Sequence, residues 1–257
     1  MAIIIKNQKQ IDLLREGGKR LASVLKQVAA HVAPGVTALE LDQLAEKLIR
    51  DMGDEPAFLR YKPYGANKPY PASLCVSVNS EVVHGIPTAK TVLKEGDIVS
   101  LDLGLKHKGL FTDHAVTVPV GKISKELREL LDTTEASMYA GIMEAIKGNK
   151  TGDVGYAIEQ FAKKKKYGIV RDLSGHGVGK HIHEDPYIPN YGKKGVGYDF
   201  RPGMVVAIEP MFNIGTDDVD LMADGYTYKT ADNKPSAHFE HTILITDGEP
   251  EILTRWD

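Results

Sequence analysis

The stretch GDIVSLDLGLKHKGLFTDHAVTV, residues 96–118, decides the fold because it reads as one antiparallel hairpin. Two apolar runs, residues 97–105 and 110–118, flank a four-residue turn, with Asp102 inside the first run and Asp113 inside the second. With that turn the two aspartates would lie directly opposite each other, with Cβ atoms about 4.5–5.5 Å apart. Two carboxylates so placed repel each other unless one is protonated or a cation lies between them. The hairpin therefore predicts a cation site.

Two glutamates lie in equally apolar strand patterns. Glu209 ends MVVAIEP, and Glu240 lies within HFEHTILIT. Alternatively, any one of these acids lies on the solvent face of an edge strand, but this explanation becomes improbable for all four together. An oxygen-rich set with one nitrogen donor suits Mn, Fe or Co better than a closed structural zinc site. Bridging carboxylates would allow two metal ions about 3.5–4 Å apart.

The histidines are concentrated in SGHGVGKHIHEDP, residues 174–186. His176 lies between glycines, which permit a close backbone approach, and is the natural nitrogen ligand. His183 lies seven residues further on, and we expect it to face the same cavity as a donor to the substrate, whereas His181 is expected at the surface. His84, in NSEVVHGIP, precedes a turn; taken alone, it could equally be a satisfied, partly buried histidine.

The composition excludes several classes of protein. The 257 residues have a net charge of −3 and a pI near 6.3, so nothing in the bulk charge indicates nucleic-acid binding. A single cysteine, Cys75, excludes an internal disulfide and a CxxC zinc site. MAIIIKNQ is too short for a signal-peptide core, and no apolar run approaches the roughly 20 residues that span a bilayer. We therefore expect a soluble, cytoplasmic protein.

Hydrophobic periodicity predicts an α+β chain with no linker between its halves. Thr37 and Glu40 form a capping-box pattern at the start of the second helix, and Gly53 follows its end. The stretches GVTALELDQLAEKLI and GNKTGDVGYAIEQFAKK echo each other weakly, which hints at two similar halves. The predicted elements are helices at 8–31, 37–52, 124–147 and 152–166, a long loop at 54–72, and further strands at 73–79, 203–209 and 238–246.

The ordered set of motifs resembles the methionine aminopeptidases over about residues 8–255. The matching motifs are VVHGIP with His84, SLDLG with Asp102, FTDHA with Asp113, SGHGVG with His176, HIHEDP with His183, AIEPM with Glu209 and FEHT with Glu240. The resemblance implies the α+β "pita-bread" fold, in which two pseudo-symmetric halves surround a curved antiparallel sheet. It also implies one metallopeptidase domain over 1–257, with a helical segment at 1–53 and a catalytic core at about 54–257. The spacings resemble the compact, bacterial type I form.

The resemblance also implies a role for each site residue. Asp102 would chelate one of two divalent ions (Co, Mn, Fe or Zn), Asp113 and Glu240 would bridge both, and His176 and Glu209 would complete the other. A bridging water or hydroxide would be the nucleophile, and Glu209 would carry its proton to the leaving amine. His183 would hydrogen-bond the substrate carbonyl, and His84 would contact the peptide nitrogen. The implied reaction removes the initiator methionine when the second residue is small.

The methionine pocket implied by the resemblance is formed by Tyr70, Cys75, Ile182 and Tyr226. Tyr226 stands where the family often has a tryptophan and Ile182 where it often has an aromatic residue, so the breadth of the pocket can differ. Cys75 could instead be a small core residue. The implied partners are nascent polypeptide N-termini, with a transient ribosome contact, no nucleic-acid specificity and no membrane, and the protein is expected to be a monomer.

Two other functions compete with this interpretation. A proline-specific aminopeptidase or dipeptidase has the same fold but usually carries an additional N-terminal domain, and only about 70 residues precede the first core strand here. A non-enzymatic binding module could also use the fold, as relatives that have lost their ligands do. The intact set Asp102, Asp113, His176, Glu209 and Glu240 argues against such a module.

Overall fold

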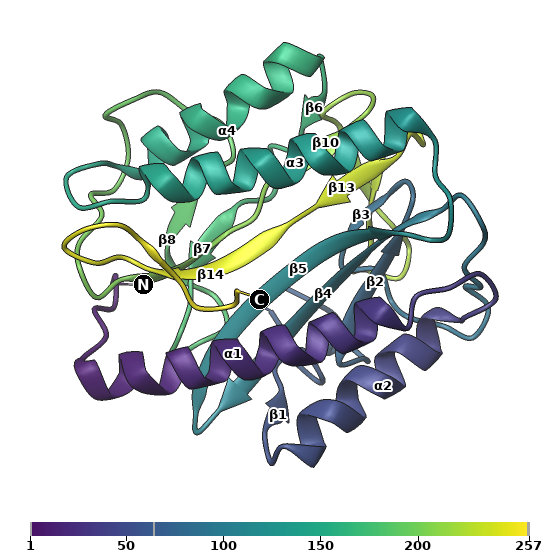
Figure 1. Ribbon diagram of the computed structural model, residues 1–257, viewed down its shortest axis with the longest axis horizontal. Coiled ribbons are helices and arrows are strands. Elements are labelled where there is room, and N and C mark those ends of the chain that lie inside the picture. The colour runs from purple at the N-terminus through teal and green to yellow at the C-terminus, as the bar shows by residue number, and fades with distance from the viewer. Residues whose placement is uncertain (1, 64, 256–257) are drawn as a thin grey trace.

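The computed structural model describes residues 2–63 and 65–255. Four helices and a set of mostly short strands make up this part of the chain (Figure 1). The helices are α1 (Gln8–Ala30), α2 (Ala38–Asp51), α3 (Lys125–Glu144) and α4 (Thr151–Lys165). The strands are β1 (Glu55–Pro56), β2 (Leu74–Val78), β3 (Glu81–Val83), β4 (Ile98–His107), β5 (Leu110–Pro119), β6 (Gly168–Ile169), β7 (Gly175–Gly177), β8 (Glu184–Ile188), β9 (Val205–Ile208), β10 (Met211–Asn213), β11 (Val219–Leu221), β12 (Tyr228–Thr230), β13 (Ser236–His238), β14 (Glu240–Leu244) and β15 (Glu251–Ile252).

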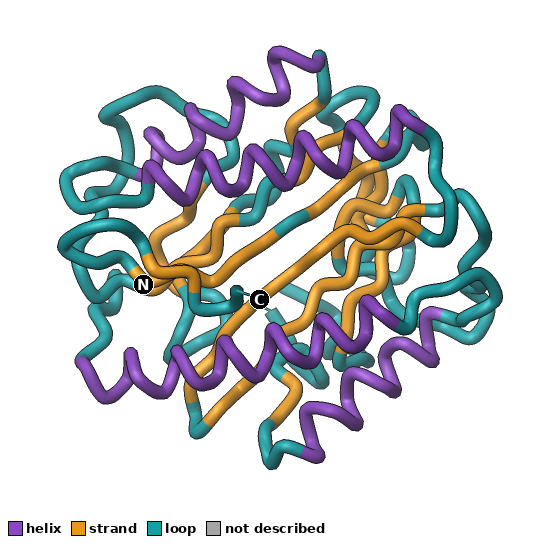
Figure 2. Tube along the Cα trace, in the orientation of Figure 1, coloured by secondary structure: helices purple, strands orange, loops and turns teal. Residues whose placement is uncertain are grey.

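The main sheet joins two halves of similar construction. Its strand order is β1-β4-β5-β14-β9-β7-β8, with β2 paired to β4 and β15 paired to β14, and every pairing is antiparallel. The helices α1 and α2 lie beside the β4–β5 half, and α3 and α4 lie beside the other half (Figures 1 and 2). The predicted α+β architecture is confirmed. The halves meet where β5 pairs with β14, at Glu240↔Ala115 and His241↔His114.

The helix ends follow from local sequence. Asn7 is the N-cap of α1 and Thr37 is the N-cap of α2. Each forms a reciprocal capping box that satisfies backbone N–H groups of the first turn. The α2 box is the one that Thr37 and Glu40 predicted. The four predicted helices are all present with ends within a few residues of those expected. Among the described helices, none is long and apolar enough to cross a membrane.

The predicted register of the central hairpin was wrong by two residues. Lys108 and Gly109 both have positive φ, +46° and +85°, which closes a two-residue turn of the kind that matches the twist of the flanking strands. As a result β4 continues to His107, which pairs with Leu110. Asp102 therefore lies opposite Ala115, and Asp113 lies opposite Gly104. Because the shift is an even number of residues, the two aspartates still share one face, as diagonal neighbours.

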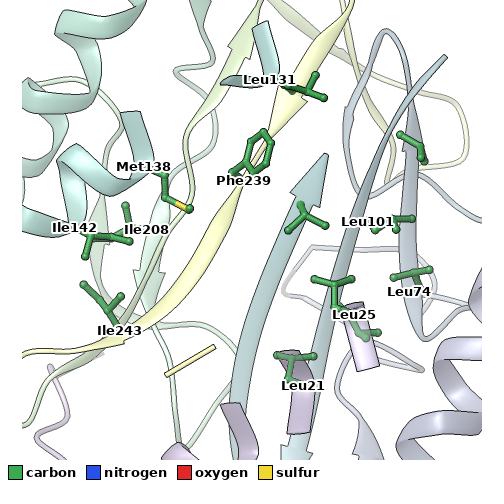
Figure 3. Close-up of a cluster of buried hydrophobic side chains, with 14 of the residues drawn as sticks. Leu21, Leu25, Leu74, Leu101, Leu131, Met138, Ile142, Ile208, Phe239 and Ile243 are labelled. Carbon is green, nitrogen blue, oxygen red and sulfur yellow. The ribbon is translucent and has the colours of Figure 1, made fainter. Parts of the chain in front are cut away.

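The hydrophobic core separates the helices from the acidic face of the sheet. Leu21 and Leu25 of α1 pack with Leu101 of β4, while Met138 and Ile142 of α3 belong to the same buried cluster on the other half (Figure 3). Side chains alternate across a strand, so neighbours of these core residues point to the opposite face. The segment 54–72 is largely loop, as predicted, although β1 within it pairs with the end of β4.

Candidate metal centre

Five donor residues come from both halves of the main sheet. Asp102 and Asp113 lie within β4 and β5, His176 within β7, Glu209 directly after β9, and Glu240 at the start of β14. Asp102, Asp113, His176 and Glu240 are buried, and Glu209 is nearly so. Strand alternation places Asp102 opposite the face that Leu101 and Leu103 present to the helices. An acid placed between two aliphatic residues of a strand therefore points its carboxyl group to the face of the sheet away from the helices.

The donor atoms of these residues converge. Nε2 of His176 lies 3.4 Å from Oε1 of Glu209 and 4.0 Å from Oδ2 of Asp113. Asp113, His176 and Glu240 each place one ligand atom within 4.8 Å of the others. The carboxyl groups of Asp102 and Asp113 hydrogen-bond each other. All five residues selected from the sequence are therefore within reach of one site.

The site raises the pKa of every carboxyl group in it. Burial is the main cause for each, and repulsion from neighbouring carboxylates adds to it for Asp113, Glu209 and Glu240. The pKa of Asp102 rises to about 7, and those of the other three rise well above their ordinary values. Without a cation, protonation of these groups is favoured, since four buried negative charges repel one another at such short range.

His176 has the tautomer that a metal ligand requires. Its Nδ1 lies 2.9 Å from the carbonyl oxygen of Gly177, which can only accept, so Nδ1 carries the proton. Burial lowers the pKa of His176 to about 4, against the opposing effect of that hydrogen bond. The ring is therefore neutral, with the lone pair of Nε2 directed at the carboxylates. A second hydrogen bond that fixes the donor nitrogen in this way is a regular feature of metal-binding histidines.

The residues fit a divalent cation. Oδ1 of Asp102 and Oε1 of Glu240 are buried and find no hydrogen-bond partner among residues 2–63 and 65–255. Unsatisfied buried oxygens are costly, and a cation would satisfy them. Four carboxylates and one neutral imidazole match the hard-to-borderline donor set of Mn, Fe, Co or Zn.

His183 and His84 both lie close to His176. The imidazole of His183 packs edge-on against that of His176, with ring centroids 4.5 Å apart. Its Nδ1 lies 2.9 Å from the hydroxyl of Tyr61. His84 adopts positive φ, +58°, and its ring lies edge-on to Tyr228 at 6.0 Å. Burial lowers the pKa of His183 to about 3 and that of His84 to about 4, so both rings are neutral. His181 is exposed, as expected.

The four residues expected to form a methionine pocket belong to one hydrophobic cluster. Tyr70, Cys75 and Ile182 are buried in it, and Tyr226 packs against it. The rings of Tyr70 and Tyr226 meet edge-on at 5.1 Å, and the Tyr226 hydroxyl donates to the carbonyl of Lys68. Cys75 pairs directly with Asp102 across β2 and β4, which joins the cluster to the acidic site. Burial raises the pKa of the Cys75 thiol well above its ordinary value.

Two residues near the site were not assigned from the sequence. Tyr61 is partly buried against the same cluster, and with Ile182 and His183 it lines a cavity of about 450 Å³. His238 is buried with Nε2 3.8 Å from Oε2 of Glu209, and neither of its ring nitrogens has a hydrogen-bond partner among the described residues. The sequence did contain a signal for His238, because it lies only two residues before Glu240, at the end of β13. Tyr61 had no comparable signal, because its contact with His183 joins two distant loops.

Comparison with known proteins supports a metal-dependent peptidase site. The family model "Metallopeptidase family M24" matches residues 12–247. "Methionine aminopeptidase 1" of Bacillus subtilis is 44% identical over 253 residues, which cover 98% of this chain and 99% of that protein. The crystal structure of methionine aminopeptidase from Thermotoga maritima is 42% identical, with a TM-score of 0.94 over 99% of this chain and 100% of that one.

A more distant structure shares the fold alone. The prolidase from Pyrococcus furiosus superposes with a TM-score of 0.77 at 22% identity, over 99% of this chain but only 66% of the prolidase chain. The two-halved pita-bread fold expected from the sequence is thereby confirmed.

Proposed function

This chain belongs to metallopeptidase family M24, and on that premise we propose that it is a metal-dependent methionine aminopeptidase. It would hydrolyse the bond after an N-terminal methionine in nascent proteins and peptides with a small second residue. The observation that carries the proposal is the convergence of His176 with four buried carboxyl groups on one face of a sheet. The nearly full-length similarity to proteins named methionine aminopeptidases supports the choice of reaction.

We assign five residues to two divalent ions. Asp102 would hold one ion, Asp113 and Glu240 would be shared between both, and His176 with Glu209 would hold the other. The diagonal placement of the aspartates and the directed lone pair of His176 support this division. When bound, Co, Mn, Fe or Zn ions would activate a water molecule and polarise the scissile carbonyl. The raised pKa values of the carboxyls mean that the ions displace protons when they bind.

Glu209 would move the proton of the reaction. Its Oε1 lies 3.4 Å from Nε2 of His176 and its Oε2 lies 3.8 Å from Nε2 of His238, so the carboxyl group lies between two buried imidazoles. A carboxyl in this position can accept the proton of the attacking water and deliver it to the leaving amine. Burial raises the pKa of this carboxyl group, which favours acceptance of the proton from the attacking water.

His183 and His84 would act on the peptide bond as neutral donors. When the Tyr61 hydroxyl donates to Nδ1 of His183, the proton of the ring lies on Nε2, where it can bond the substrate carbonyl oxygen. A donor placed at the developing oxyanion stabilises the transition state more than the substrate. His84 would contact the nitrogen of the scissile peptide. The low pKa of both histidines avoids adding charge beside the metal ions.

Tyr70, Cys75, Ile182 and Tyr226 would enclose the methionine side chain. Their membership of one apolar cluster next to Asp102 supports this assignment. An apolar pocket of limited size favours an unbranched thioether over longer or charged side chains. We further propose that the enzyme acts in the cytoplasm as a monomer on nascent chains, with a transient contact to the ribosome.

A paired peptide assay on metal-stripped enzyme tests the function. Met-Ala-Ser and Ala-Pro-Ala are each incubated with added Mn, Co, Fe or Zn, and then with a chelator. We expect metal-dependent release of methionine from the first peptide alone. Cleavage of the second peptide alone would instead identify a proline-specific peptidase. If no divalent ion binds after reconstitution, the protein is a binding module rather than an enzyme.

A further inference from the structure

A fully buried ion pair joins the start of the chain to the loop that carries His183. Nζ of Lys6 lies 2.7 Å from Oε2 of Glu184, and each side chain is only 1% exposed. The other carboxylate oxygen, Oε1, accepts the backbone N–H groups of Lys180 at 2.5 Å and of His181 at 3.0 Å. One carboxylate thus binds a cation on one side and two backbone amides on the other.

The position of Lys6 is set by the surrounding backbone. Its N–H donates to the carbonyl of Gly203 at 2.8 Å, and its ammonium group also donates to the carbonyl of Ile4 at 3.3 Å. The stem of the side chain crosses Gly179, where a Cβ atom would lie 2.5 Å from Cε of Lys6. Gly179 has φ of +142°, so a glycine is needed there for conformation as well as for space.

The ion pair closes the base of the catalytic loop. Gly177 of β7 pairs with Glu184 of β8, with an irregular register after His176, so residues 178–183 form the connection between these strands. This connection presents buried Ile182 and the His183 ring, which lies 4.5 Å from that of His176. His176 lies in the main sheet. Backbone hydrogen bonds join Val178 and Gly179 of the connection to Val205 and Phe111, whereas the amides of Lys180 and His181 are bound by Glu184. The ion pair therefore lies at the end of the connection that carries His183.

We propose that Lys6 and Glu184 form a positioning pair that holds His183 and Ile182 in their working places. The inference rests on the proposed function, in which His183 donates to the substrate carbonyl. Without the ammonium group, the buried carboxylate would have to rotate toward water and release the amides of Lys180 and His181. A displacement of a catalytic group by about 1 Å can cost about a hundredfold in rate. Lys6 and Glu184 would thus affect turnover without touching the substrate.

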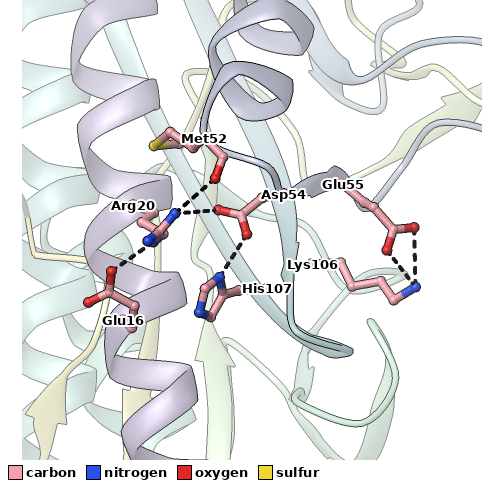
Figure 4. Close-up of polar contacts among 7 residues, drawn as sticks. All are labelled: Glu16, Arg20, Met52, Asp54, Glu55, Lys106 and His107. Carbon is pink, nitrogen blue, oxygen red and sulfur yellow. Dashed lines mark hydrogen bonds and ion pairs between the residues drawn. The ribbon is translucent and has the colours of Figure 1, made fainter.

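A second ionic cluster provides a matched control. Arg20 of α1 donates to Oδ2 of the buried Asp54 at 3.3 Å and to Glu16 at 2.7 Å, and Asp54 also lies 2.7 Å from Nδ1 of His107 (Figure 4). Its carboxylate, like that of Glu184, depends on a cation from the first part of the chain. None of the contacts drawn in Figure 4 reaches His176 or His183. Arg20→Met therefore removes a cation, more exposed than Lys6, from a buried carboxylate without touching the catalytic loop.

The experiment compares Lys6→Met with Arg20→Met in the metal-loaded enzyme, well below either melting temperature. Both variants should melt at lower temperature than the wild type. Only Lys6→Met should lower kcat on Met-Ala-Ser, by about ten- to a hundredfold, with bound metal unchanged. Glu184→Gln, which keeps an oxygen for the backbone amides, should show a smaller loss and remains informative if Lys6→Met does not fold. Lys6→Arg should restore part of the rate. Equal kcat in Lys6→Met, Arg20→Met and the wild type would overturn the proposal.

A double-mutant cycle with His183→Ala separates positioning from general damage. If Lys6 acts through His183, then Lys6→Met should lower kcat by less than about twofold in the His183→Ala background, because coupled residues are not additive. A full additive loss would show that the ion pair acts elsewhere, and the positioning role would be wrong. Wild-type cleavage of Met-Ala-Ser is measured alongside. Its absence would refute the proposed function instead, so the two failures can be told apart.

Discussion

Nε2 of His176, in β7, lies 3.4 Å from Oε1 of Glu209, which follows β9, although the two residues are 33 positions apart in the sequence. The opposite nitrogen of the ring donates to the carbonyl of Gly177. The imidazole is thus neutral, and the lone pair of its Nε2 is available to bind a metal ion. This relationship supports the proposal that the acids and His176 bind metal ions together.

Replacing His176 by alanine should remove metal and activity together. The variant loses the nitrogen donor while the repelling carboxyls remain, so reconstituted enzyme should contain less metal and release no measurable methionine. Metal analysis and the peptide assay are run on the same preparation. His181→Ala serves as control because His181 is exposed, and it should keep both properties. Retention of full metal content by His176→Ala would contradict the assignment.

Replacing His183 by alanine should keep the metal and abolish most turnover. The residue is proposed to contact the transition state, so kcat should fall by about 10²–10³-fold, the usual cost of one oxyanion donor. Metal content and the melting temperature of the loaded enzyme should change little. Release of the metal by this variant would mean that His183 is itself a ligand.

Tyr61→Phe should lower kcat modestly without loss of metal. The change removes the hydroxyl that lies 2.9 Å from Nδ1 of His183 and leaves the packing of the ring. A neutral hydrogen bond contributes about 0.5–1.5 kcal/mol, which corresponds to a two- to tenfold loss of rate. Tyr187→Phe, at an exposed tyrosine, should show wild-type kinetics. An unchanged kcat in Tyr61→Phe would indicate that His183 does not need this contact.

Metal affinity should rise with pH between about 6 and 8. Burial raises the pKa of Asp102 to about 7, so below that pH the group holds a proton that an ion must displace. His176, with its pKa lowered to about 4, is already neutral and releases none. The expected slope is up to about tenfold in affinity per pH unit for each proton released. Titration calorimetry of Mn²⁺ in two buffers of different ionisation enthalpy counts the protons.

Asp102→Asn tests the origin of those protons. The amide cannot release the proton that Asp102 holds near neutral pH, so this variant should release fewer protons on binding. It should also weaken one of two ions more than the other, since Asp102 is assigned to only one. Equal weakening of both ions, or unchanged proton release, would contradict these assignments.

Local chemistry explains why much of the site could be predicted from sequence. The capping boxes at Asn7 and Thr37 place helix ends through contacts within four residues. Strand alternation directs Asp102 away from the aliphatic neighbours that pack on the helices. An acid inside an apolar strand is costly without a partner, so each such acid marks the site independently of the others.

The sequence by itself determined the four helices, the longer strands and the shared face of Asp102 and Asp113, because caps and alternation act over a few residues. Only the tertiary structure decided the hairpin register, which depends on positive φ at Lys108 and Gly109. It also decided the contacts of His183 with Tyr61 and of Glu184 with Lys6. Those pairs lie far apart along the chain, so they form only when packing of the two halves brings distant loops together.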